Sequence, residues 1–114
     1  MFKFQSQVLY EQLSLFVKEV FVLSGKLPAY ESNGLIKQLR GLASGILEDY
    51  AESSVRTSKT GNYITEKCVT NIAKISSLID LCHHLGYIDK FVHDKWLWSC
   101  NDTVKRLYDS EKHK

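Results

Sequence analysis

The sequence has few residues that interrupt helices, with one proline and six glycines among 114 residues. Because proline and glycine are the strongest local breaks in regular structure, a chain with so few of them is expected to contain few and long elements. We expect breaks at residues 24–28, 52–54 and 86–89. No segment alternates apolar and polar residues with a period of two, so no β-strand is predicted.

Cysteines and long apolar runs are also scarce. The three cysteines are an odd number without paired spacing, which is typical of reduced thiols in a cytoplasmic protein rather than of a secreted disulfide scaffold. The longest hydrophobic stretch, residues 13–23, includes two charged side chains and is about half as long as a membrane-spanning helix. The N-terminus has no apolar segment typical of a signal peptide. We therefore predict a cytoplasmic protein with no membrane partner.

Neither sign of charge dominates the composition. Fifteen lysines and arginines against 13 acidic residues give a formal net charge of +2, far from the balance of a dedicated nucleic-acid binder. Hydrophobic residues make up 44% and charged residues 25% of the chain, as in ordinary globular domains. A single domain over residues 1–114 is predicted, and it needs no disulfide, metal or cofactor to fold.

Helical periodicity is the main pattern that is present. Between the breaks lie four segments of roughly 20–25 residues whose apolar residues recur every 3.6 positions. Short connections make sequential helices antiparallel, so the predicted fold is an all-α, up-down-up-down four-helix bundle. Ser32 or Asn33 is expected to cap the second helix, Gly86 to end the third, and Asp89 to cap the fourth. The expected core consists of Leu9, Leu13, Phe16, Val17, Val20, Leu35, Leu39, Leu42, Ala43, Ile46, Tyr50, Ile64, Cys68, Ile72, Ile75, Ile79, Cys82, Val92, Trp96, Cys100, Val104 and Leu107.

A second set of apolar residues lies away from the expected core face. In the first helix these residues begin at Phe4 and are spaced four, seven and seven positions apart. In the fourth helix, Trp96 and Trp98 point about 200° apart, so one narrow core face cannot bury both. Aligned exposed apolar stripes predict self-association, whereas the alternative is a wide core. The predicted interface residues are Val8, Leu15, Val22, Tyr87, Phe91 and Trp98.

Two glycines on the second helix also favour self-association. Gly41 and Gly45 are one helical turn apart, and each costs about 1 kcal/mol relative to alanine inside a helix. Together they would form a smooth patch that another helix could approach closely. Alternatively, they are tolerated surface residues.

Several motifs resemble a known family. Leu27-Pro28, the segment 31–40 (Glu-Ser-Asn-Gly-Leu-Ile-Lys-Gln-Leu-Arg), Ala51-Glu52 and residues 85–88 (Leu-Gly-Tyr-Ile) resemble motifs of the four-helix-bundle family of bacterial 23S rRNA-intervening-sequence proteins. The chain departs from the family pattern in the second helix, where glycines stand at positions 41 and 45 in place of arginine and serine. The resemblance implies a non-enzymatic bundle that assembles into a ring, commonly a homopentamer. The chain is also similar to the accessory variability protein of diversity-generating retroelements, a ring-forming, nucleic-acid-binding partner of a reverse transcriptase.

Groups with metal-binding chemistry are adjacent rather than convergent. Cys82, His83 and His84 diverge by about 100° per residue on a helix, so they cannot converge on one ion. The pairs Asp80 with His84 and Asp89 with His93 each supply two ligands, fewer than a structural zinc site needs. We therefore predict no metal site.

The acidic cluster on the second helix is the strongest catalytic candidate. Glu48 and Glu52, with Asp49 between them, could share a proton or hold a cation. More often such a cluster is a solvated helix face whose negative charges are balanced by nearby basic residues, here Arg56 and Lys59. Because no nucleophile elbow, phosphate-binding loop or dinucleotide loop is present, no catalytic residue is predicted and the chain is not expected to be an enzyme.

Basic residues leave two functions open. Residues 53–79 contain four basic residues and one acidic residue, a net charge of +3. One subunit would neutralise only a few phosphates, but a ring would repeat the patch and gain avidity. The leading prediction is an oligomeric scaffold or adaptor, and the alternative is an accessory protein that binds RNA or DNA and partners a reverse transcriptase. The candidate nucleic-acid contacts are Lys37, Arg40, Arg56, Lys59, Lys67 and Lys74.

Overall fold

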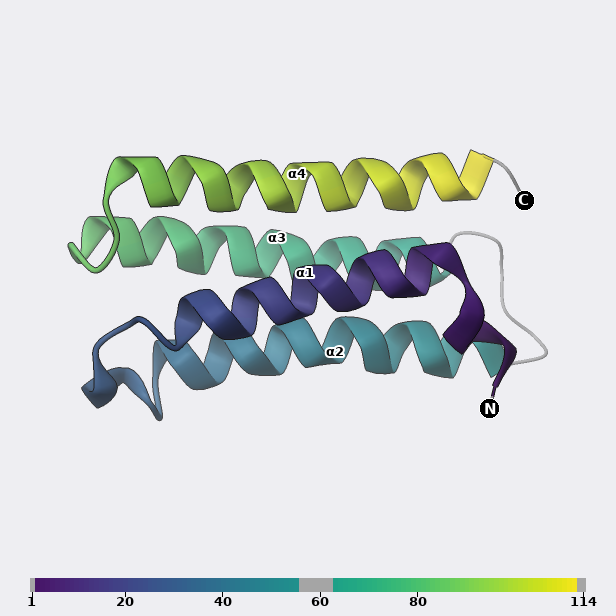
Figure 1. Cartoon of the computed structure of the whole chain (residues 1–114), viewed down its shortest axis with the longest axis horizontal. Helices are drawn as coiled ribbons and strands as arrows, with labels where there is room; N and C mark the ends of the chain where they lie inside the picture. Colours follow the sequence, from purple (N-terminus) through teal and green to yellow (C-terminus); the bar gives the residue numbers. More distant parts are fainter. Residues whose placement is uncertain (1, 56–62, 113–114) are drawn as a thin grey trace.

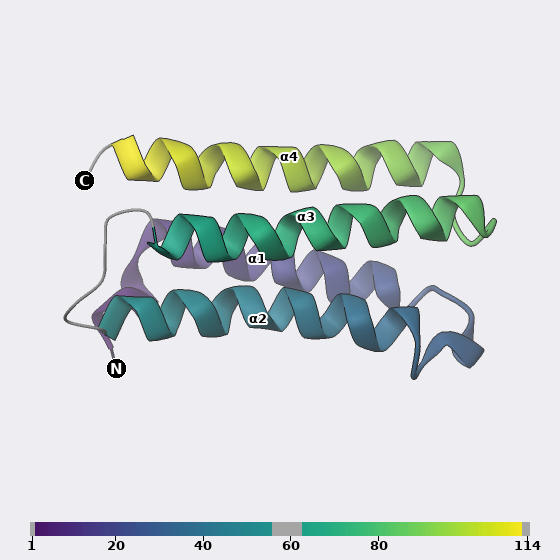
Figure 2. The same ribbon diagram turned by 180° about the vertical axis from the view of Figure 1, so that it is seen from behind.

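The computed structural model describes residues 2–55 and 63–112, and it forms an antiparallel four-helix bundle (Figure 1). Its elements are η1 (Lys3–Ser6), α1 (Val8–Ser24), η2 (Ala29–Glu31), α2 (Leu35–Val55), α3 (Tyr63–His84) and α4 (Lys90–Lys112). The bundle measures 44 × 25 × 20 Å, and the α1–α2 and α3–α4 connections lie at the same end (Figures 1 and 2). The all-α fold is confirmed, and within the described ranges no helix is both long and apolar enough to cross a membrane.

The predicted core is confirmed nearly residue by residue. Trp96, Leu13 and Ile46 are completely buried, and burial of each such side chain stabilises the fold by about 1.5–3 kcal/mol or more. Four of the predicted core residues are only partly buried and pack against the margin of this core: Leu9, Leu42, Ile64 and Val104. Val92 is partly buried too. The helical spacing of apolar residues therefore identified the inward faces correctly.

All three cysteines lie in this core as free thiols. Burial raises the pKa of Cys68 to about 12 and that of Cys100 to about 11, and it also raises the pKa of Cys82. The thiols are consequently protonated at neutral pH and pack as small hydrophobic groups rather than as nucleophiles.

The predicted end of the third helix and the predicted start of the fourth are confirmed. Gly86 has φ +78° and donates its N–H to the His83 carbonyl at 3.0 Å, while Tyr87 donates to the Cys82 carbonyl at 2.9 Å. This pair of bonds is the Schellman arrangement that ends many helices. The Asp89 carboxylate accepts the Val92 N–H at 2.9 Å and so caps α4.

Both predicted ends of the second helix are wrong. Neither Ser32 nor Asn33 caps α2, which begins at Leu35, because the Leu35 N–H donates instead to Glu31 Oε1 at 3.2 Å. The predicted break at residues 52–54 is helical, and α2 continues to Val55. The Ser54 hydroxyl donates to the Tyr50 carbonyl at 2.7 Å, which lets a residue with low helix propensity remain in the helix.

The N-terminal segment corrects one member of the second apolar stripe. Phe4 lies in η1 rather than in α1, and it is buried. Its ring packs against Tyr10 and Tyr50 with centroid distances of 5.2 and 6.3 Å. Phe4 therefore closes the core at this end, and the exposed stripe on α1 begins at Val8.

Candidate functional site: an exposed apolar face on α1 and α4

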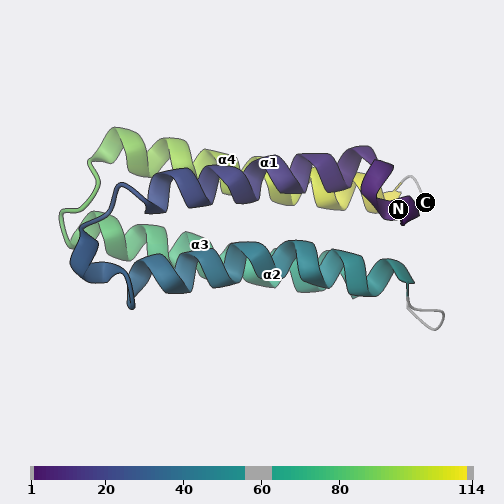
Figure 3. The same cartoon turned by 60° about the horizontal axis from the view of Figure 1, so that its bottom comes forward.

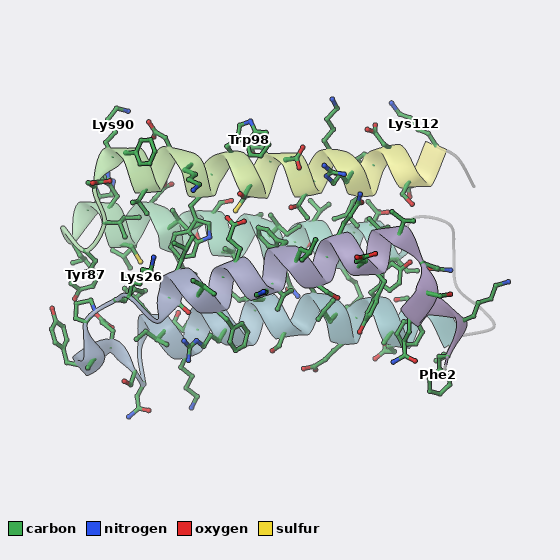
Figure 4. The ribbon with its side chains drawn as sticks, viewed as in Figure 1. Phe2, Lys26, Tyr87, Lys90, Trp98 and Lys112 are labelled. Atoms are coloured by element: carbon green, nitrogen blue, oxygen red, sulfur yellow. The ribbon has the colours of Figure 1, made fainter. Side chains whose placement is uncertain are left out.

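Five large apolar side chains on α1 and α4 are more than half exposed, and we call them the α1–α4 face. Their exposed fractions are 69% for Val8, 59% for Leu15, 53% for Val22, 76% for Phe91 and 66% for Trp98. The two helices lie next to each other above α2 and α3 (Figure 3). Trp98 projects from the outer side of α4 (Figure 4), while Trp96 is fully buried. Five of the six residues predicted for the interface therefore share one surface.

A groove runs between the two helices of this face. One hollow of about 500 Å³ is lined by Val22, Phe91, Lys18 and Lys95, among others. A second hollow of about 350 Å³ is lined by Trp98 and other residues from both helices. Leu15 lines both hollows, so the groove extends along the middle of the α1–α4 face.

Two polar atoms at the base of this groove have no hydrogen-bond partner in the described part of the chain. They are Nε1 of Trp96 and Oε1 of Glu19, and both are buried. Both residues also line the larger hollow. A buried polar atom without a partner costs about 1–3 kcal/mol. These two polar atoms at the contact between α1 and α4 are therefore left without a hydrogen bond by the described residues.

Tyr87, the sixth predicted interface residue, lies elsewhere. Its hydroxyl donates to Glu31 Oε2 at 2.8 Å, and its ring meets that of Tyr30 edge-on at 6.1 Å. The side chain is half-buried against η2 (Figure 4). Tyr87 thus joins the α3–α4 connection to the start of α2 and does not extend the α1–α4 face.

The glycine patch predicted on α2 is divided between two environments. A Cβ at Gly41 would meet nothing within 4 Å, whereas a Cβ at Gly45 would lie 3.2 Å from Nδ2 of Asn71 on α3. Gly45 therefore faces a helix of its own bundle. The prediction of a continuous patch for an external helix is wrong at this position.

Arg40, one of the predicted nucleic-acid contacts, is bonded to the end of α1. Its Nε donates to Ser24 Oγ at 3.0 Å and its Nη2 to the Phe21 carbonyl at 3.1 Å. The guanidinium also lies 5.1 Å from the centroid of the Phe21 ring. A cation at this position stabilises the negative C-terminal end of a helix, so Arg40 has a structural role.

The other predicted basic contacts fall into three groups. Lys67 lies 3.4 Å from Asp49 and 3.9 Å from Glu52, so it pairs with two of the three carboxylates of the predicted acidic cluster. The exposed residues are Lys37 on α2 and Lys74 on α3. The residues outside the described ranges are Arg56 and Lys59.

A histidine near the α3–α4 connection is the centre of a polar cluster. Nε2 of His93 lies 2.7 Å from Asp80 Oδ1, and its Nδ1 lies 3.0 Å from Asp94 Oδ1. Its ring centroid is 4.8 Å from that of His83. The pKa of His93 is raised, mainly by the hydrogen bond to Asp80 and to a smaller extent by the hydrogen bond to Asp94. Asp89, the expected i,i+4 partner of His93, caps α4 instead.

This cluster predicts a pH-dependent contribution to stability. Because the folded-state pKa of His93 is raised, protonated His93 stabilises the fold. That stabilisation is present below the unfolded-state pKa of about 6.5 and is lost as the pH rises through the higher folded-state value. We expect His93→Gln to lower the melting temperature more at pH 5.5 than at pH 8.5, measured by circular dichroism. His84→Gln, at an exposed position, is the control, and equal losses for His93→Gln at both pH values would contradict the prediction.

No family model, curated protein or solved structure matches the chain. The family resemblance therefore remains a prediction, and the structure gives its motif residues structural roles at one end of the bundle. Arg40 closes α1, Glu31 joins α2 to Tyr87, and Gly86 ends α3. A Cβ at Gly34 would lie 2.5 Å from Glu31 Oε1, so the glycine leaves room for that carboxylate. These residues specify the connections of a bundle rather than a chemical site.

Proposed function

We propose that this protein is a non-enzymatic homo-oligomeric scaffold or adaptor whose subunits meet through the α1–α4 face. The observation that carries the proposal is the alignment of five large apolar side chains, each more than half exposed, on two adjacent helices. Scattered exposed apolar residues are normal on a monomer, but an aligned patch that includes aromatic residues is typical of an interaction surface. Its removal from water would favour association by about 25 cal/mol per Å² of apolar surface buried.

The engagement of the basic residues favours this proposal over a nucleic-acid-binding function. Arg40 is bonded to the end of α1, and Lys67 faces Asp49 and Glu52. Of the six predicted contacts, Lys37 and Lys74 are the exposed ones within the described ranges. Two lysines per subunit would neutralise few phosphates, so affinity for RNA or DNA would depend on repetition in an assembly.

The family resemblance adds a specific form of assembly to the proposal, a homopentameric ring. A ring is built from a head-to-tail contact, in which a patch on one subunit meets a different patch on the next. In such a ring the α1–α4 face would supply one of the two patches.

The mass of the wild-type protein in solution tests the proposal. Size-exclusion chromatography with light scattering is expected to give a multiple of the 13.1 kDa chain mass at micromolar concentration. A mass of five chains would support the ring, and a mass of two chains would support a dimer. A stable species of one chain across the concentration range would overturn the scaffold proposal.

A further inference from the structure

The charges on the α1–α4 face are arranged around its centre. On α1, Glu11 lies one turn before Leu15 and Lys18 lies about one turn after it. On α4 the order is reversed, with Lys95 before Trp98 and Asp102 one turn after it. Spacings of three and four residues keep side chains on one face of a helix, so each central apolar residue lies between a cation and an anion.

The antiparallel arrangement of α1 and α4 gives the face a basic half and an acidic half. Lys18 and Lys95 lie at the same end and line the larger hollow together with Lys26, and Glu19 is the one anion among the residues given for that hollow. Glu11 and Asp102 lie at the other end, where Asp102 lines the smaller hollow together with Glu19 and with Arg106, its ion-pair partner. Leu15 and Trp98, which line that hollow together, separate the two halves.

Three of the four central charges have no ion-pair partner within residues 2–55 and 63–112. Glu11, Lys18 and Lys95 are exposed, and they occur in no ion pair of this region. Asp102 is bonded to Arg106 at 2.9 Å. The unpaired charges are therefore available to groups outside the subunit.

We infer that the α1–α4 face binds a second copy of this chain, turned about a two-fold axis that lies across the helices at the level of Leu15 and Trp98. This inference rests on the self-association proposed above, and it specifies a two-fold contact of the α1–α4 face in place of the head-to-tail contact that a homopentameric ring would use. The rotation lays α1 antiparallel on α1 and α4 antiparallel on α4. The basic half of each copy then covers the acidic half of the other.

The spacing of the charges fits this symmetry. At 1.5 Å per residue, Glu11 and Lys18 lie about 6 and 4.5 Å from Leu15 in opposite directions along α1. The rotation therefore brings Glu11 of each copy next to Lys18 of the other, and it pairs Lys95 with Asp102 in the same way. A two-fold axis parallel to the helices would instead place Lys18 against Lys95 and Glu11 against Asp102, which like-charge repulsion disfavours.

The apolar centre of the α1–α4 face also suits contact with a second copy of the same face. A two-fold interface uses the same patch on both subunits, so the patch must complement itself. Here the central apolar side chains of one copy, Leu15 and Trp98, meet those of the other, and the charges flank them on both sides. The bundle is 44 Å long and 25 Å wide in its second dimension, which leaves room for the about 800 Å² per subunit that a standard interface buries.

A charge-exchange experiment tests the two-fold arrangement. Glu11→Lys alone and Lys18→Glu alone each turn both Glu11–Lys18 pairs of the dimer into like-charge pairs. We expect either variant to raise the dimer dissociation constant at least about tenfold at low salt, as measured by sedimentation velocity. An equimolar mixture of the two variants restores both pairs across the interface and is expected to return to within about threefold of the wild-type constant.

Two further variants complete the design. The double variant Glu11→Lys/Lys18→Glu carries both exchanged charges in one chain, so it is expected to dimerise on its own. Lys37→Glu reverses an exposed charge on α2, outside the face, and should leave the dissociation constant unchanged. Circular dichroism checks that each variant retains its helix content, since Glu11 lies in the first turn of α1.

The possible failures are distinguishable. If the wild type self-associates but neither the mixture nor the double variant recovers dimerisation, the two-fold arrangement is wrong and the scaffold proposal stands. A wild-type mass of five chains that is insensitive to these exchanges would also overturn the two-fold arrangement. A monomeric wild type would overturn both proposals.

Discussion

Replacement of Leu15 and Trp98 by glutamate in one chain is expected to dissociate the proposed oligomer into 13.1 kDa subunits while the helices remain intact. The two side chains are 59% and 66% exposed, so the subunit loses little core packing when they change. In the proposed assembly the same positions would lie at the centre of the buried face, where a carboxylate without a partner is costly. Central aromatic anchors typically contribute about 2 kcal/mol or more to an interface, so the double variant should remain monomeric at concentrations where the wild type associates.

Light scattering after size exclusion measures this effect, and circular dichroism monitors the fold. Leu81→Glu is a matched control, because Leu81 is a leucine on α3 that is 42% exposed and lies outside the α1–α4 face. We expect the control to retain the wild-type mass. If Leu15→Glu/Trp98→Glu also retains that mass, the subunits associate through a different surface.

The fold could be predicted because the information that specifies it is local. Ile72, Ile75 and Ile79 lie on one face of α3 at helical spacing, and all three are buried. Gly86 and Asp89 act on their own turns, through bonds that span a few residues. Amphipathic periodicity and local caps therefore suffice for the number, order and inward faces of the helices.

The two ends of α2 were predicted wrongly because contacts from outside the helix outweigh its local sequence signals. The Glu31 side chain reaches the start of α2 from η2, so the serine and asparagine before α2 do not act as caps. Ser53 is completely buried in α2, where packing outweighs the low helix propensity of serine. A helix pattern gives no signal for either effect, because both depend on tertiary contacts.

In the candidate site, too, the local features could be predicted from the sequence and the contacts between distant residues could not. The exposed stripe could be found because the spacing of Trp96 and Trp98 forces one of them outward. The placement of Tyr87 could not be found, since its partner Glu31 is 56 residues away in the chain. The engagement of Lys67 by Asp49 likewise joins two helices. Periodicity thus identifies faces, whereas the pairing of charges between helices requires the structure.

Arg40→Ala is expected to destabilise the bundle by about 2–3 kcal/mol. The substitution removes two hydrogen bonds from a charged donor, to Ser24 and to the Phe21 carbonyl. It also removes the guanidinium that lies over the Phe21 ring and the cation at the C-terminal end of α1. Arg40→Lys keeps the charge but not the planar pair of donors, so it should recover less than half of the loss.

Chemical denaturation measures these changes, with Lys37→Ala as the control three residues earlier on α2. Lys37 is exposed, and its substitution should change the free energy of unfolding by less than about 0.5 kcal/mol. If Arg40→Ala were as mild as Lys37→Ala, the contacts of Arg40 with α1 would contribute little and its charge would be available to a nucleic acid. If instead Arg40→Ala destabilises the bundle as expected, a loss of RNA binding in that variant would not identify Arg40 as a contact. Lys37 and Lys74 are then the positions at which a nucleic-acid-binding function can be tested without disturbing the fold.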